Sequence, residues 1–147
     1  MYKKLLVPID EGKLSRKAVD HAVKLAQALN AQVVGLHVSF PYTIPYATDG
    51  MIVDAMPPAE YRTAAEKRAH RLVSILEKKA MAAKVKFSIR HAFSDAPWEE
   101  ILAIARKDKC DAIVMASHGR RGIAAVLLGS ETQKVLTHSK LPVIVVR

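Results

Sequence analysis

The chain has 147 residues, half of them apolar and a quarter charged, which is the composition of one globular domain over 1–147. No apolar run approaches the roughly 20 residues that span a bilayer, and the single cysteine excludes an internal disulfide, so we expect a cytoplasmic protein with no membrane partner. A net charge of +9 could mark a nucleic-acid binder, but the basic residues are dispersed and only 5% of the chain is aromatic, so nucleic acid is not an expected partner.

The N-terminal part predicts two strands around one helix. The apolar residues of KKLLVPI predict a strand over 3–9. Alanine, valine and leucine recur at helical spacing over 15–29, and Asn30 is a suitable C-terminal stop for this helix. A β-rich stretch predicts the second strand over 32–38.

Prolines and a glycine break the rhythm between residues 40 and 58 and predict a long connection, with a turn of helix near 52–55. Two roles for this connection remain open, a lid over a ligand or an ordinary surface loop. A long amphipathic helix with a basic outer face is expected over 59–83. Apolar and polar residues alternate over 85–91, which is typical of a half-exposed strand near a sheet edge.

The C-terminal part continues the alternation. Ser94 and Asp95 are candidate N-caps for a short helix over 98–107. The continuous apolar run after Asp111 predicts a strand, over 111–116, that is buried on both faces. The last two expected elements are a helix over 130–139 and a strand over 141–146.

Strands that alternate with helices indicate βαβ units. We therefore expect an α/β fold with a single doubly wound open sheet of five mainly parallel strands and helices on both faces. In such sheets the ligand crevice lies beyond the carboxyl ends of the strands, where the strand order reverses. The expected carboxyl ends are residues 8–10, 38–40, 92–95 and 115–119.

Two residue clusters at these ends could bind a ligand. Asp10 could accept hydrogen bonds from a ribose or hold Mg²⁺ through water, or it could only start a turn and help to cap the next helix. In ASHGRRGIAAVLLGSETQ, the glycines could provide positive φ for turns or expose backbone amides to an anion. Ser130 and Gln133 form an S-x-x-Q capping box, and the start of a helix also attracts phosphate. Arg120 and Arg121 add positive charge nearby, so a phosphate site is favoured.

These segments together resemble a universal stress protein of the UspA superfamily over nearly the whole chain. The resemblance is carried by KKLLVPID, GLHV, DAIVMASHGRRG and SKLPVIVVR. It implies an adenine nucleotide α-hydrolase-like fold and, through the pattern G-x-x-G-x9-G-[S/T] of the nucleotide-binding branch, an ATP site. Gly119, nine further residues and Gly129-Ser130 match that pattern, whereas Ala116 stands at its first glycine. Alanine is tolerated there if the position is an ordinary strand end.

The resemblance implies a role for each matching position. Asp10 would lie on the ribose or metal side, with Mg²⁺ held through water. The phosphates would be surrounded by backbone amides and the Ser130 hydroxyl, and Arg120 would add charge. The implied nucleotide-binding residues are Pro8, Ile9, Asp10, Val38, Met115, Ala116, Gly119, Arg120, Gly129, Ser130 and Glu131.

No motif assigns a catalytic residue. His118 in the glycine-rich turn has no partner nucleophile, and the sequence contains neither a G-x-S-x-G elbow nor a Walker G-x-x-x-x-G-K-[ST] motif. The resulting hypothesis is an ATP-binding, nucleotide-occupied stress-response module that hydrolyses ATP slowly at most.

A rival function is open from the sequence. A nucleotide-free interaction protein of the same fold would act through its dimer and its basic helix face, and Ala116 keeps this alternative open. Nucleic-acid binding through the surface formed by residues 62–90 ranks below both. The resemblance implies a homodimer paired through the C-terminal strand, residues 141–147, which would otherwise be an exposed apolar edge.

Overall fold

Strands and helices alternate throughout this computed structural model, which describes residues 1–43, 56–119 and 128–147. The expected turn of helix near 52–55 and the possible lid lie outside the described residues, as do Arg120 and Arg121. In chain order the elements are β1 (Lys4–Pro8), α1 (Lys13–Leu29), β2 (Gln32–Ser39), α2 (Pro58–Ala82), β3 (Phe87–Phe93), α3 (Pro97–Lys107), β4 (Ala112–Ala116), α4 (Ser130–His138) and β5 (Val143–Val146).

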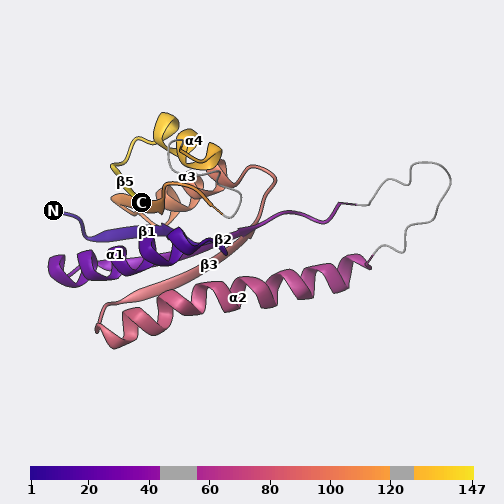
Figure 1. Cartoon of the computed structure of the whole chain (residues 1–147), viewed down its shortest axis with the longest axis horizontal. Helices are drawn as coiled ribbons and strands as arrows, with labels where there is room; N and C mark the ends of the chain where they lie inside the picture. Colours follow the sequence, from indigo (N-terminus) through magenta and orange to yellow (C-terminus); the bar gives the residue numbers. More distant parts are fainter. Residues whose placement is uncertain (44–55, 120–127) are drawn as a thin grey trace.

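The strands form a sheet of five in the order β3-β2-β1-β4-β5, and every neighbouring pair is parallel. This confirms the expected doubly wound fold. In Figure 1, α3 and α4 cover one face of the sheet, α1 and α2 lie on the other, and α2 extends past the end of the sheet. β3 and β5 are the edge strands, as their partly exposed side chains require. Among the described residues, no helix is long and apolar enough to cross a membrane.

Alternate side chains of the central strands supply two separate cores. Leu5 and Val7 of β1 pack with α1 and α2, whereas Leu6 between them packs with α3 and α4. This alternation follows from the period of two in a strand, and burial on both faces explains the continuous apolar runs of β1 and β4. Leu5, Leu6 and Val7 are each 0% exposed, so β1 lies at the centre of the molecule.

Two expected helix caps are wrong. The N-cap of α3 is Ala96, which has no capping side chain; the Ser94 hydroxyl accepts a hydrogen bond from the Ala96 amide and forms a local turn instead. The N-cap of α4 is Gly129, so Ser130 is already inside the helix and the capping box does not form. In both cases the helix begins at a different residue from the one that the local pattern predicts, so the expected hydroxyl does not occupy the N-cap position.

Several boundaries also differ from the expected ones. α1 begins two residues early, at Lys13, and the third strand is shifted to Phe87–Phe93. β5 begins only at Val143, because the Ser139 hydroxyl bonds to the backbone of Leu141 and holds a turn there.

Candidate functional site

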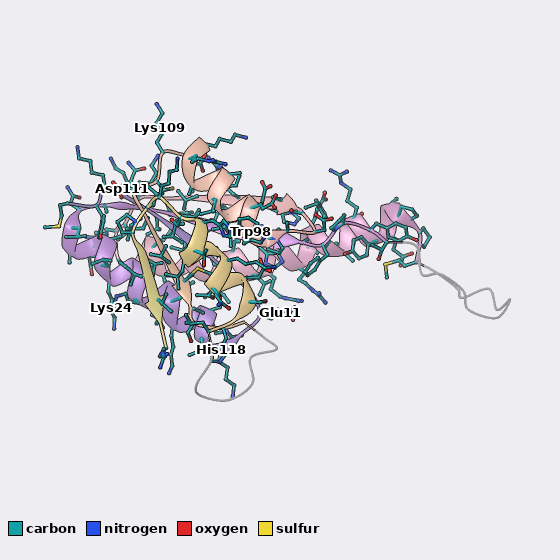
Figure 2. All side chains as sticks on the ribbon, turned by 90° about the horizontal axis from the view of Figure 1, so that it is seen from above. Glu11, Lys24, Trp98, Lys109, Asp111 and His118 are labelled. Atoms are coloured by element: carbon teal, nitrogen blue, oxygen red, sulfur yellow. The ribbon has the colours of Figure 1, made fainter. Side chains whose placement is uncertain are left out.

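The strand order reverses between β1 and β4. The chain runs from β1 outward to β2 and β3 on one side, and then returns to place β4 and β5 on the other side. Connections from the carboxyl ends of β1 and β4 therefore diverge, and this is where doubly wound sheets bind ligands. Figure 2 shows Glu11 and His118, which follow these two strands, on one side of the molecule, whereas Lys109 and Asp111 at the amino end of β4 lie on the other.

Asp10 is held firmly at the end of β1. Its amide donates a hydrogen bond to the Ser15 hydroxyl over 2.9 Å, and its Oδ1 accepts one from the Gly12 amide over 2.8 Å. One carboxylate oxygen thus organises the turn into α1, as the local interpretation expected. The other oxygen, Oδ2, faces Gly119 at the end of β4. The chain segments that follow β1 and β4 therefore meet at Asp10 and Gly119.

Gly119 and Gly129 leave room for neighbouring atoms, and neither residue is required by an unusual φ angle. Neither Gly119 nor Gly129 has a positive φ, so the turn explanation fails for both. A Cβ on Gly119 would overlap Asp10 Oδ2. A Cβ on Gly129 would lie 3.0 Å from the Cα of His118. Each glycine permits a close approach between two segments that border the crevice.

The start of α4 is fastened to the end of β4. The Gly129 amide donates to the Ser117 carbonyl over 2.8 Å, and the buried Thr132 hydroxyl donates to the Ala116 carbonyl over 2.9 Å. The Gly129 amide is consequently engaged by the protein itself, and Gly129 affects the site through its missing side chain. The first bond of the helix runs from the Gln133 amide to the Gly129 carbonyl, so the amides of Ser130, Glu131 and Thr132 have no helical carbonyl as partner.

The Glu131 carboxylate, in the first turn of α4, contacts α3 and Lys134. Its Oε2 accepts a 2.8 Å hydrogen bond from the Trp98 amide in the first turn of α3, and its Oε1 lies 3.6 Å from Lys134 Nζ. A carboxylate at the N-terminus of α3 also interacts favourably with the positive end of that helix's dipole. The side chain therefore joins α3 to α4 and leaves only the Glu131 backbone for a ligand.

The other residues named from the sequence lie in one of the two cores or at the end of a strand. Ile9 is 4% exposed and lies in the α1/α2 core, where its amide bonds to Leu36 and its carbonyl to His37. Val38 and Met115 pack on the opposite face, with α3 and α4. Pro8 and Ala116 are the last residues of β1 and β4. Ala116 has no positive φ, so the expectation of an ordinary strand end is confirmed.

Three polar contacts near the site were not expected from the sequence. Ser15 and Thr132 are 1% and 3% exposed, and each holds a chain end of the crevice by a side-chain hydrogen bond. A hydroxyl residue in the first turn of a helix was their only sequence signal. The third contact stacks His37 on His91, with ring centroids 6.0 Å apart, and parallel pairing of the two residues in β2 and β3 explains it.

Burial and neighbouring positive charge make His91 a weak base. Desolvation lowers its pKa first, and His37 and Arg62 lower it further, against an opposing effect of Glu66. His91 Nε2 lies 2.8 Å from the Ser39 hydroxyl. His91 is therefore harder to protonate than a free histidine, and its ring packs at the ends of β2 and β3.

The described residues hold no preformed metal cluster, since no three His, Cys, Asp or Glu side chains converge. A Mg²⁺ ion at Asp10 would need phosphate and water as its other ligands, which is how proteins usually hold this ion. A hollow of about 580 Å³ lies at the opposite, amino ends of the strands, near Tyr2, Lys3 and Lys84. Its lining contains no acidic residue or histidine, so we place the site at the carboxyl ends.

The fold defines the class of the molecule, an α/β protein of the adenine nucleotide α-hydrolase-like type whose strand order reverses between β1 and β4. The model of the universal stress protein family matches residues 1–147. The chain belongs to this family.

Relatives of known sequence support the same assignment. The chain is 32% identical over 149 residues to universal stress protein YxiE of Bacillus subtilis, with both chains covered completely. It is 31% identical to universal stress protein MJ0577 of Methanocaldococcus jannaschii, covering 100% of this chain and 96% of the relative.

Solved structures share the fold. That of MJ0577 superposes with a TM-score of 0.80 at 26% identity, covering 99% of this chain and 96% of the other. A universal stress protein in complex with cAMP has a TM-score of 0.70 at 27% identity, with coverage of 99% and 97%. An Arabidopsis thaliana family protein with AMP bound has a TM-score of 0.67 at 16% identity, with coverage of 97% and 90%, and supports the fold alone.

Proposed function

We propose that the protein belongs to the ATP-binding branch of its family and binds ATP in the crevice between β1 and β4. The observation that carries the proposal is the direct approach of the Asp10 carboxylate to Gly119, which also lies at the carboxyl ends of the strands, as does the N-terminus of α4. The structure of a relative with cAMP, at 27% identity, agrees with an adenine nucleotide as the ligand.

In this arrangement the phosphates would contact the amides of Gly119, Ser130 and Glu131 and the Ser130 hydroxyl. Asp10 would accept a ribose hydroxyl or hold Mg²⁺ through water, and a bound Mg²⁺ would neutralise phosphate charge. Val38, Met115 and the chain at Pro8 would border the base and sugar. Arg120 would add positive charge.

Hydrolysis of the bound ATP would be slow at most. The His118 ring lies 3.2 Å from the hydroxyl of its neighbour Ser117, and none of the described carboxylates contacts it. No described residue is therefore arranged as a general base for an attacking water. We infer a cytoplasmic module whose state depends on nucleotide occupancy, in accord with its buried, reduced cysteine.

Calorimetric titration with ATP and Mg²⁺ tests the proposal. Gly119→Ala would displace the Asp10 carboxylate, whose end is the flexible part of the contact, so the fold should persist while ATP affinity falls about tenfold or more. Asp10→Asn should weaken binding as well. Asp95→Asn removes an exposed carboxylate after β3 and should leave the affinity unchanged. Equal ATP affinity in wild type and Gly119→Ala would contradict the proposed site.

One observation favours the rival, a nucleotide-free dimeric interaction protein of the same fold. The Gly129 amide, which the family resemblance would assign to a phosphate, already bonds to the Ser117 carbonyl. This rival predicts no binding heat at millimolar ATP.

In either function we propose a homodimer paired through residues 141–147, because β5 has a neighbour on one side only.

A further inference from the structure

Positive charge is concentrated on one face of the molecule. α1 carries four Lys and Arg residues against one Asp, and α2 carries six against three Glu. α3 carries two against two, and α4 one against one. The α1/α2 layer therefore has an excess of six positive charges, and the α3/α4 layer has none.

α1 and α2 lie side by side, and much of the acidic charge is used where they meet. Asp20 of α1 pairs with Lys79 of α2, and Glu11 just before α1 pairs with Arg68 over 3.2 Å. Near the C-terminal ends of the two helices, the Gln27 side chain donates to the Ala83 carbonyl over 3.1 Å. In Figure 1 the two helices lie on the same side of the sheet. The basic residues that flank this junction therefore belong to one surface.

Besides Lys13, which begins α1, six cations of the two helices are exposed and have no carboxylate within ion-pair distance among the residues that the structure describes. Lys67, Arg71 and Lys78 follow one line along α2 over about 16 Å. Of the remaining α2 acids, Glu66 pairs with Arg62, Glu60 lies in the first turn, and Glu77 is half-buried. We call the six cations the α1/α2 basic surface; they are Arg16, Lys17, Lys24, Lys67, Arg71 and Lys78.

We propose that the α1/α2 basic surface binds the phosphate backbone of double-stranded nucleic acid without reading its bases. Unpaired Lys and Arg side chains in an extended array supply the electrostatic contacts on which such binding depends. α1 contains no aromatic residue, and Tyr61, the aromatic residue of α2, uses its hydroxyl to bond the Phe40 carbonyl. The surface therefore lacks the stacking platforms that single strands require.

An anionic membrane is the less suitable occupant. Interfacial helices insert large apolar side chains between lipids. On α1 and α2, the described large hydrophobic side chain that is exposed is Met81, near the C-terminal end of α2. Phosphate binding to a duplex needs no such insertion.

From the sequence alone, nucleic-acid binding was not expected, because the basic residues are dispersed along the chain. The fold removes that objection, since it places the basic residues of 16–24 beside those of 67–78, two segments that β2 separates in the chain. The proposal concerns the helices on one face and does not depend on nucleotide in the crevice.

Fluorescence anisotropy with a labelled duplex of about 20 base pairs tests the proposal. We expect micromolar affinity at 50 mM salt and about a hundredfold loss at 200 mM, which corresponds to about four phosphate contacts. The variant Lys17→Gln, Lys67→Gln, Arg71→Gln should bind at least tenfold more weakly at 50 mM salt, with a salt slope reduced by about three.

A matched control removes the same charge elsewhere. Arg106→Gln, Lys107→Gln, Lys140→Gln changes three exposed cations at the end of α3 and in the connection to β5, and should bind within about threefold of wild type. Equal weakening by both variants would mean that net charge alone acts, and would overturn the proposal. So would the absence of duplex binding at 50 mM salt, or binding to phosphatidylserine vesicles in its place. Circular dichroism melting should confirm that both variants fold.

Discussion

Gly119 illustrates how a missing side chain shapes this molecule at the scale of single residues. Its φ is ordinary, yet any Cβ would overlap the Asp10 carboxylate. The sequence could indicate that Gly119 and Asp10 both lie at strand ends, because alternating elements place those ends at one edge of a sheet. It could not predict their contact, because the approach depends on how the turns at Gly12 and Ser15 orient Asp10.

Cys110 should be chemically inert in the native protein. Burial raises the pKa of its thiol to about 11, with Asp108 as the next contribution, so the nucleophilic thiolate is scarce at neutral pH. The native thiol should remain unmodified by Ellman's reagent at pH 8 and react promptly in urea. Because the folded-state pKa is raised, stability should fall as the pH rises from about 9 towards 11. Fast native labelling at pH 8 would contradict this expectation.

His91 should contribute to acid sensitivity. Its pKa is lowered in the folded state by burial and by His37, so the unfolded chain takes up a proton first as the pH falls below about 6.5. The urea midpoint of wild type should therefore decrease between pH 7 and 5. His91→Gln should decrease less over the same range. Identical pH profiles of the two proteins would show that His91 has no part in this loss.

At the scale of elements, the N-terminus of α3 is stabilised by a residue of another helix. The Glu131 carboxylate accepts the Trp98 amide, and this contact replaces the local cap that Ser94 and Asp95 suggested. A cap from 33 residues further along the chain has no local signal. This is why helix positions followed from hydrophobic spacing, whereas the two caps predicted from short patterns were wrong.

Glu131→Ala should lower the free energy of unfolding by about 1 kcal/mol, because a partly buried helix amide loses its charged acceptor. Urea denaturation measures the change. Glu131→Gln keeps an acceptor oxygen and should lose less. Glu99→Ala, which removes only a charge from the first turn of α3, should cost about 0.3–0.5 kcal/mol. A cost for Glu131→Ala no larger than that of Glu99→Ala would contradict the capping role.

At the scale of the whole molecule, the alternation of strands and helices was sufficient to predict a doubly wound parallel sheet. Apolar runs also identified the buried strands. Which helices share a face was not predictable from these local patterns, so the charge asymmetry between the α1/α2 and α3/α4 layers emerged only from the fold.

The free edge of β5 leads to a prediction about assembly. Pro142 and Val146 direct their carbonyls to β4, so by alternation the amide of Val145 faces outward. Val145→Pro removes this outward donor, leaves the β4 pairing intact, and should convert the proposed dimer to a monomer. Light scattering after size exclusion at micromolar concentration measures the mass. Val145→Thr keeps the amide and should remain dimeric; a dimeric Val145→Pro would place the interface elsewhere.

The central claim is that the crevice between β1 and β4 retains an adenine nucleotide. Native mass spectrometry of protein purified without added nucleotide tests it most directly. We predict an additional mass equal to that of ATP or one of its breakdown products, which disappears in Gly119→Ala. A wild-type protein that carries no additional mass, and gains none when millimolar ATP and Mg²⁺ are added, would contradict the account.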